Sequence, residues 1–202
     1  LSGEVLTTPN TIRFNSKPVG HMTPNERRAL GVLAAPEERL GHAAAPDMDL
    51  IENSMLTAMV RKNLSNAGFL NWQRAKAFTQ TIIDEFDVRT PGPQSIARSL
   101  SGGNLQKYVI GREVLQDPDV LIVNQPTWGV DAAAAAAIRQ SLLDLAGKGA
   151  AIIVISQDLD ELMEISTQFS ALNNGKLSVA QPMAKFSLDE IGLLLGGADA
   201  ST

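Results

Sequence analysis

Two unbroken hydrophobic runs, residues 120–123 and 151–155, form the strongest pattern in the chain. Each is short and lacks polar alternation, which is typical of a strand buried on both faces of a sheet. Between them, Asp131 can cap a helix that six consecutive alanines, residues 132–137, favour. Strand, helix and strand in this order predict a parallel βαβ unit in a sheet covered on both faces. Residues 31–35 are expected to add a further strand.

Local turn and cap signals predict smaller elements near both ends of the chain. Residues 4–19 mix short apolar stretches with Pro and Asn, which indicates short antiparallel strands joined by tight turns. The run Thr23-Pro24-Asn25-Glu26 has a cap residue, an early Pro and a Glu three positions after the cap, so it predicts a helix start. The run Asn173-Asn174-Gly175 predicts a hairpin turn between residues 169–172 and 176–179.

From about Pro46 to Phe86 the hydrophobic positions recur at steps of three and four, the spacing of an α-helix. Two helical faces are expected to pack into a core: Leu50, Ile51, Met55 and Met59 on one, and Trp72, Ala75, Phe78, Ile82, Ile83 and Phe86 on the other. The pattern predicts a helical subdomain inserted into an α/β fold.

Three further helices are predicted from their start signals. One follows residues 100–104 and runs to about Gln116, and another covers residues 158–166. The run Ser187-Leu188-Asp189-Glu190 is a capping pattern for a last short helix before Gly196 and Gly197.

Composition excludes several chemistries. The chain has 202 residues, 44% of them hydrophobic, with a net charge of −5, no Cys and two His. Without Cys there is no disulfide framework, Cys-rich zinc site or cysteine nucleophile. The acidic balance and the scattered Lys and Arg argue against nucleic acid as a partner. His21 and His42 are expected to be exposed loop residues, because neither has a second ligand at metal spacing.

Chemistry is concentrated in three short segments. In Leu100-Ser101-Gly102-Gly103-Asn104, two glycines at a helix start let backbone amides approach a phosphate, although an ordinary helix start has the same pattern. Asn124 and Gln125 follow the first buried strand, and Ser156-Gln157-Asp158 follows the second. The carboxyl ends of parallel strands are where α/β sheets place ligand chemistry. Asn124 and Gln125 can also satisfy backbone groups at a strand end.

In this order, the segments resemble the ATP-binding subunits of ABC transporters, in particular the second, degenerate nucleotide-binding half of tandem ATPases that import sugars or nucleosides. Glu37, in Pro36-Glu37-Glu38-Arg39-Leu40-Gly41, stands at the usual Q-loop glutamine. The other correspondences are residues 100–104 with the ABC signature, residues 120–125 with the Walker B strand, Gly129-Val130-Asp131 with the D-loop and residues 156–158 with the switch region.

The resemblance implies an α/β fold: a P-loop ATPase core of the ABC type with a small antiparallel β-subdomain and an inserted helical subdomain. It assigns residues 1–45 to the β-subdomain and start of the core, 46–114 to the helical subdomain, and 115–202 to the core with Walker B, D-loop and switch. The family's G-x-x-x-x-G-K-[ST] motif is not found in the sequence. We therefore expect a chain truncated after Walker A, which binds ATP weakly or not at all by itself.

The resemblance also implies a weak hydrolytic site. Asn124 stands where an Asp helps to hold Mg²⁺, Gln125 where a Glu polarises water, and Gln157 where a switch His is usual. An amide does not accept a proton, and general-base catalysis contributes roughly 10²–10⁴-fold. This half is expected to hydrolyse ATP poorly, and the chain alone to be inactive.

The signature is nearly intact and is expected to act in trans. Ser101, Gly102, Gly103 and Asn104 would contact ATP held by a partner half, with Asp131 beside them in the D-loop. The resemblance implies ATP and Mg²⁺ as cofactors of the intact assembly. It implies a second ABC ATPase half and transmembrane permease subunits as partners, and a cytoplasmic location peripheral to the inner membrane. Two alternatives stay open: a non-catalytic dimerisation or regulatory module, and an ABC ATPase that does not serve transport.

Overall fold

A computed structural model describes residues 1–195; Gly196 and Gly197 of the expected tail lie outside the described residues. The chain divides into two compact units, residues 1–155 and a second unit that begins at Ser156. The boundaries expected from the sequence, at residues 45 and 114, stay predictions.

The first unit is built on a three-stranded parallel sheet in the order β3 (Val32–Ala35), β6 (Val120–Asn124) and β7 (Ala151–Ile155). Helix α5 (Ala132–Gly147) connects β6 to β7, and Asp131 caps it as expected. The predicted βαβ unit is therefore confirmed.

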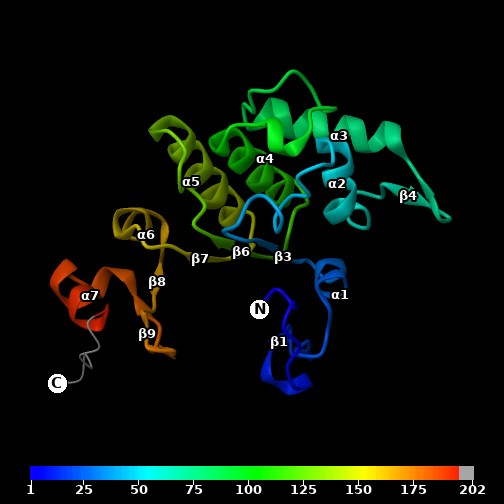
Figure 1. Ribbon diagram of the computed structural model, residues 1–202. Helices are drawn as coiled ribbons and strands as arrows, with labels where there is room; N and C mark the ends of the chain where they lie inside the picture. Colours follow the sequence, from blue (N-terminus) through cyan, green and yellow to red (C-terminus); the bar gives the residue numbers. More distant parts are fainter. Residues whose placement is uncertain (196–202) are drawn as a thin grey trace. The chain divides into compact units, whose positions relative to one another are not determined.

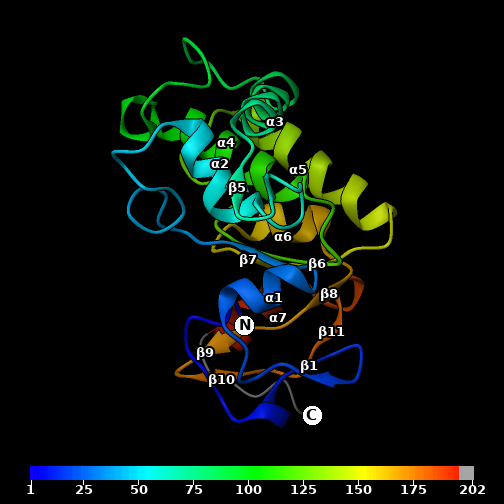
Figure 2. The same ribbon diagram turned by 90° about the vertical axis from the view of Figure 1, so that its right-hand side faces the viewer.

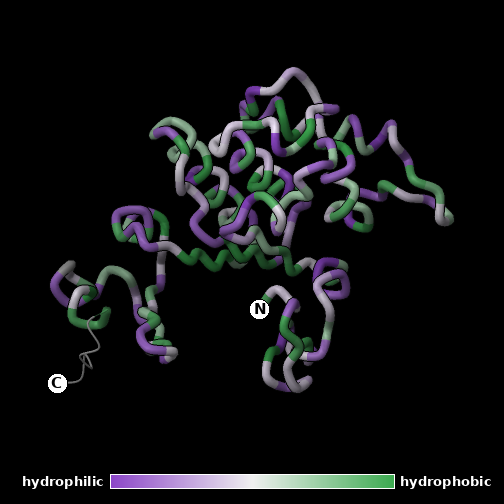
Figure 3. The backbone as a smooth tube through the Cα atoms, viewed as in Figure 1, coloured by the Kyte–Doolittle hydropathy of each residue, from purple (hydrophilic) through white to green (hydrophobic). Residues whose placement is uncertain are grey.

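The two faces of the sheet are covered unequally within this unit. Helices α2 to α5 lie on one side of it, and the short helix α1 (Pro24–Ala29) lies on the other, next to β3 (Figures 1 and 2). Leu33 and Leu121 are fully buried under the helices, whereas Ile153 and Ile155 keep 40% and 48% of their surface exposed. Figure 3 shows β7 as a hydrophobic stretch. The expectation of burial on both faces is confirmed for residues 121–123 of β6, which are all buried, and was wrong for β7, whose residues are exposed or half-buried.

The inserted helices are α2 (Leu50–Ala58), α3 (Trp72–Glu85) and α4 (Gly102–Val114). Most of the predicted apolar positions are buried, but Met59 and Trp72 are 37% and 51% exposed, which corrects their assignment to the core. Met59 follows the end of α2, and Trp72 is the first residue of α3, so neither faces the packed helices.

A hairpin interrupts the insert between α2 and α3, which the helical period did not predict. Strands β4 (Ser65–Asn66) and β5 (Phe69–Leu70) pair across Ala67 and Gly68, both with positive φ. Glycine adopts this conformation at no steric cost, and two such residues in sequence form the tight turn of a two-residue hairpin.

The N-terminal segment contains the expected antiparallel pair, β1 (Arg13–Phe14) with β2 (Lys17–Pro18), after a 3₁₀ turn, η1 (Pro9–Thr11). Thr23 and Glu26 form the predicted capping box of α1. The remaining 3₁₀ turn of this unit, η2 (Ala97–Ser99), precedes α4.

The second unit contains four short strands and two helices among its described residues. Asn174 and Gly175 form the predicted hairpin turn, but Phe169 belongs to a different strand pair, which corrects the predicted hairpin arm. Ser187 and Glu190 make the predicted cap. The elements are α6 (Leu159–Ile165), β8 (Gln168–Phe169), β9 (Leu172–Asn173), β10 (Lys176–Leu177), β11 (Gln181–Pro182), η3 (Met183–Lys185) and α7 (Leu188–Leu195).

A buried ion network holds α4 to its neighbours. The Glu113 carboxylate accepts hydrogen bonds from Arg112 Nε at 2.9 Å and from Arg28 Nη1 of α1 at 2.6 Å. Arg112 also donates to the carbonyl oxygens of Ala43 and Asn53, at 2.7 and 3.2 Å. Burial by itself lowers the pKa of Arg112, but Glu113 and Tyr108 together more than offset it, so the pKa is raised and the side chain stays a cation.

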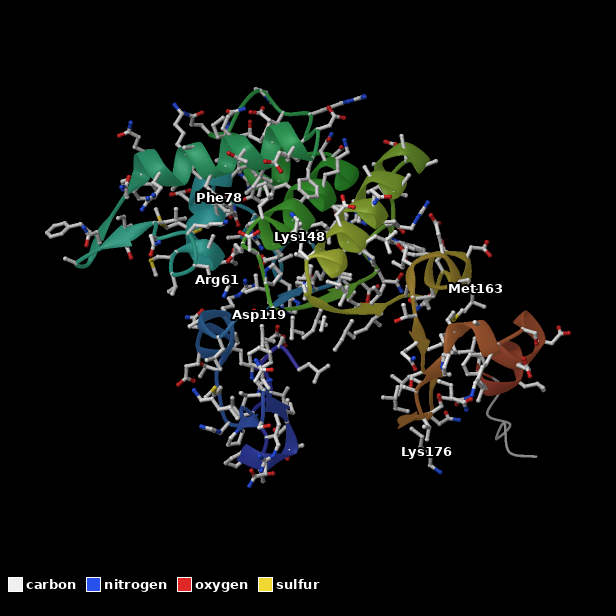
Figure 4. The ribbon with its side chains drawn as sticks, turned by 180° about the vertical axis from the view of Figure 1, so that it is seen from behind. Arg61, Phe78, Asp119, Lys148, Met163 and Lys176 are labelled. Atoms are coloured by element: carbon white, nitrogen blue, oxygen red, sulfur yellow. The ribbon has the colours of Figure 1, made fainter. Side chains whose placement is uncertain are left out.

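A second set of contacts fixes α2 to the turn between α4 and β6. Arg61, just after α2, donates to the carbonyl oxygens of Gln116 and Asp117 and lies beside Asp119 (Figure 4). Lys62 pairs with the Asp117 carboxylate at 3.0 Å and lies over the Phe78 ring of α3.

We predict that Glu113→Ala lowers the free energy of unfolding by about 3–5 kcal/mol, because it leaves two arginines without their buried carboxylate. The matched control is Asp47→Ala, which breaks an ion pair with Arg98 whose side chains are 75% and 67% exposed. That loss is expected to be about 1 kcal/mol or less. Urea denaturation followed by circular dichroism measures both, and equal losses would contradict the role of the buried network.

Candidate functional site

An open cleft of about 680 Å³ lies where β3 and β6 end. It brings together Glu37, from the segment after β3, and Asn124, the last residue of β6. These two predicted site residues are far apart in the sequence and meet because β3 and β6 are parallel neighbours. The lining residues are Pro36, Glu37, Glu38, Arg39, Leu40, His42, Leu105, Asn124 and Trp128.

The predicted signature residues lie at the start of α4. Ser101 is the N-cap, and its Oγ accepts hydrogen bonds from Asn104 Nδ2 at 2.9 Å and from the Asn104 amide at 3.5 Å. The Asn104 Oδ1 atom in turn accepts from the Arg89 amide at 2.9 Å. Ser101 and Gly102 are exposed, so the helix start is open to solvent. A helix N-terminus with free amides attracts anions.

The start of α4 contacts the predicted D-loop. A Cβ built on Gly103 would lie 3.5 Å from the Gly129 carbonyl oxygen and 3.7 Å from Cα of Val130. Asp131 follows directly and caps α5. The structure therefore places two of the sequence-predicted segments, residues 101–104 and 129–131, side by side.

Gln125 lies at the centre of this region with its backbone in the left-handed conformation, at φ +53°. Its backbone N–H donates to the Ile155 carbonyl oxygen of β7 at 2.8 Å, and its backbone carbonyl oxygen accepts from the Trp128 backbone N–H at 3.2 Å. The residue is 8% exposed. A left-handed non-glycine residue is uncommon, and such conformations cluster at functional sites.

Asp131 serves the helix in the described structure. Its Oδ1 accepts from the Ala134 amide at 2.9 Å, and this hydrogen bond is the main reason why the pKa of Asp131 is lowered.

Gln157 lies at the start of the second unit and is exposed. Its neighbours form the start of α6: Asp158 caps the helix, and Ser156 Oγ donates to Glu161 Oε2 at 2.8 Å. The assignment of Gln157 to the switch position stays a prediction.

Two residues of the site, Arg39 and Gln106, were not among those predicted from the sequence. Arg39 Nε donates to Gln106 Oε1 at 2.9 Å, and Arg39 Nη2 donates to the Trp128 carbonyl oxygen. Gln106 Nε2 donates to the carbonyl oxygens of Pro126 and Gln125, at 2.8 and 3.3 Å. For Gln106, the available signal was its position four residues before Ile110, which places a polar side chain on a buried face of α4.

Within residues 1–195, no group of three or more His, Asp or Glu residues is placed to hold a metal ion by itself. The cleft does offer the amide oxygen of Asn124 and the carboxylates of Glu37 and Glu38. Mg²⁺ takes oxygen ligands of this kind and often shares them with phosphate oxygens, so the chemistry of these donors fits Mg²⁺. In the same part of the chain, no helix is long and apolar enough to span a bilayer.

Both histidines are exposed, as predicted. His42 Nε2 lies 3.1 Å from Glu4 Oε1.

The sequence relatives of the chain include ATP-binding proteins of import systems. The guanosine import ATP-binding protein NupO of Bacillus subtilis is 33% identical over 198 residues, which is 98% of this chain and 39% of that protein. The galactose/methyl galactoside import ATP-binding protein MglA of Escherichia coli is 36% identical over 168 residues, 83% of this chain and 33% of that protein. The chain thus spans about two fifths or less of the length of these relatives. No family model matches the chain.

Solved structures decide the fold. A dimeric post-hydrolysis state of the ATP-binding cassette MJ0796, bound to ADP and Pi, superposes with a TM-score of 0.69 at 16% identity and covers 84% of this chain and 72% of that one. The chain has the ATP-binding cassette fold. A nucleotide-free cassette from an ABC transporter gives a TM-score of 0.67 at 19% identity over 96% of this chain and 76% of the other. The cassette fold confirms the α/β core of the ABC type.

We predict that the cap of the cassette helix α5 depends on pH. The folded state stabilises the carboxylate of Asp131, so its pKa there lies below the usual 3.8. The contribution of this carboxylate to the free energy of unfolding is therefore complete above about pH 3.8 and is lost as the pH falls through the pKa of the folded state. Asp131→Asn keeps an acceptor but removes the charge. Its deficit in melting temperature relative to the unmodified chain should be largest near pH 7 and shrink towards pH 3.

The comparison variant is Asp131→Ala, which loses the acceptor at every pH. Its deficit should persist at low pH. Thermal melts at several pH values measure both variants, and a deficit of Asp131→Asn that is constant with pH would contradict the assignment.

Proposed function

We propose that the chain is part of the ATP-binding subunit of an importer for a simple sugar or a nucleoside. In this proposal it supplies the signature segment, residues 100–104, to ATP held by the P-loop of a partner half. The observation that carries it is the open start of α4 packed against residues 129 and 130 beside the cleft. The import functions in the names of NupO and MglA favour the substrate class.

The signature would act through its backbone. Ser101 and Gly102 are exposed, and a side chain at Gly103 would enter the contact with Gly129. Small residues at these positions let a nucleotide's phosphates approach the helix start, where the amides and the helix dipole favour negative charge. The phosphates would also need a P-loop, which this sequence does not contain.

The same half would be a slow hydrolytic site. Asn124 presents a neutral amide to the cleft, and Gln125 offers no carboxylate to take a proton from water. We therefore assign hydrolysis to the composite site completed by Ser101, and a supporting role to the site that contains Asn124. ATP and Mg²⁺ are the cofactors of the complete assembly in this proposal.

The partners in this proposal are a second ATPase half and transmembrane permease subunits. The surface around Glu37 and the helical insert would contact the permease, so the chain would lie at the cytoplasmic side of the inner membrane. One observation favours a second function, that of a non-catalytic dimerisation module: Gln125 is buried and its backbone groups are tied to Ile155 and Trp128. ATPase activity of the assembly separates the two functions.

In the assembled transporter, we predict that Ser101→Arg lowers ATPase activity by roughly 10²-fold or more, because the arginine blocks the approach of the phosphates to donors that stabilise developing charge. Asn124→Ala should lower it less than about tenfold, since its site is already the slow one. Steady-state phosphate release measures both.

The control is Ser99→Arg, which adds the same charge at an exposed position of η2, two residues before the signature serine. It should retain most of the activity. Equal losses in Ser101→Arg and Asn124→Ala would contradict the division of roles.

A further inference from the structure

We propose that Arg39 is a positioning residue, which holds the start of α4 and residues 128–129 in one fixed arrangement. The contact itself is independent of the proposed function. Its consequence for ATP hydrolysis rests on that function, because it deepens the account of the signature site.

The guanidinium of Arg39 reaches two different elements. Its Nε donates to Gln106 Oε1 on α4 at 2.9 Å, and its Nη2 donates to the Trp128 carbonyl oxygen after β6. A planar fork fixes the direction of both hydrogen bonds at once, which a single ammonium group does not. One side chain therefore sets the position of Trp128 relative to α4.

Gln106 completes the link. Its side chain is 2% exposed, and its Nε2 donates to the carbonyl oxygens of Pro126 and Gln125. The side-chain amide of Gln106 thus accepts a hydrogen bond from Arg39 through Oε1 and donates hydrogen bonds to the segment after β6 through Nε2. Removing either partner would leave a buried polar group without its hydrogen bond, which costs more than the bond itself contributes.

Two glycines fit against the same guanidinium. A Cβ on Gly102 would lie 2.9 Å from Arg39 Nη1, and a Cβ on Gly129 would lie 3.2 Å from Nη2. Gly129 also has a φ of +67°, a conformation that L side chains rarely adopt. Arg39 therefore occupies the space between the signature segment and the residue that follows Trp128.

The segment that carries Arg39 is itself anchored. The Ala44 amide donates to the Arg39 carbonyl oxygen at 2.8 Å, and Arg112 Nη2 donates to the carbonyl oxygen of Ala43 at 2.7 Å. The segment thus contacts α4 at two points, through Gln106 and through Arg112. A rigid base of this kind is what a positioning side chain requires.

Trp128 provides a direct readout in the full chain. The sequence has two tryptophans, so Trp72→Phe leaves Trp128 as the single tryptophan, which can be excited apart from the one tyrosine. In that background, Arg39→Ala should raise the amplitude of the fast, nanosecond part of the Trp128 anisotropy decay about twofold, because loop motion on this timescale is released. Gln106→Ala should have a similar effect.

The double variant Arg39→Ala/Gln106→Ala should show no more motion than either single variant, because groups of one network do not act additively. Arg39→Lys keeps the charge without the fork and should lie between the unmodified chain and Arg39→Ala. The control Arg98→Ala removes an exposed arginine and should leave the decay unchanged. An unchanged decay in folded Arg39→Lys and Arg39→Ala, or additive effects in the double variant, would overturn the proposal.

Activity then separates the positioning role from the proposed function. In the complete ATPase assembly, Arg39→Ala should lower kcat by roughly 10- to 100-fold with a KM for ATP within about threefold, because misplacing a group by about 1 Å has costs of this order. If Ser101→Arg has no effect while the anisotropy responds to Arg39→Ala, the proposed function fails and the positioning contact stands. If Ser101→Arg abolishes activity while the anisotropy does not respond, the positioning role fails.

Discussion

The buried pair of Arg112 and Glu113 is the constraint on which the first unit depends. Both side chains are at most 1% exposed, so each charge needs its partner and every remaining polar atom needs a hydrogen bond. The partners come from α1, α2, the segment after β3 and α4 itself. A single residue pair therefore fixes three other parts of the chain to one helix, and that helix begins with the signature segment.

The site follows from this arrangement. Because α4 is fixed at its far end, its N-terminus has a set position relative to the carboxyl ends of β3 and β6, where Glu37 and Asn124 meet. The glycines at residues 102, 103 and 129 then allow the loops to approach the helix start. Stability and function thus share one element: the packing of α4 positions a segment that a ligand would contact.

Features with a local cause could be predicted from the sequence. The caps at Thr23, Asp131 and Ser187 depend on hydrogen bonds within one helical turn, and the βαβ unit depends on adjacent segments. The predicted site residues Glu37 and Asn124 meet because parallel pairing of β3 and β6 brings their ends together.

Features that depend on distant partners could not be predicted in this way. The exposure of Ile153 depends on which helices reach the second face of the sheet, a fact that no local pattern contains. The link from Arg39 to Gln106 joins residues 67 positions apart, and a single arginine in a loop gives no sign of it.

Calorimetric titration with ATP and Mg²⁺ tests the central claim most directly, that this chain completes a nucleotide site held by a partner. The chain alone should give no measurable heat of binding. With a partner half that carries an intact P-loop, addition of the chain should tighten ATP binding, and Ser101→Arg should remove that gain. Micromolar binding of ATP by the chain alone, or a gain unaffected by Ser101→Arg, would contradict the account.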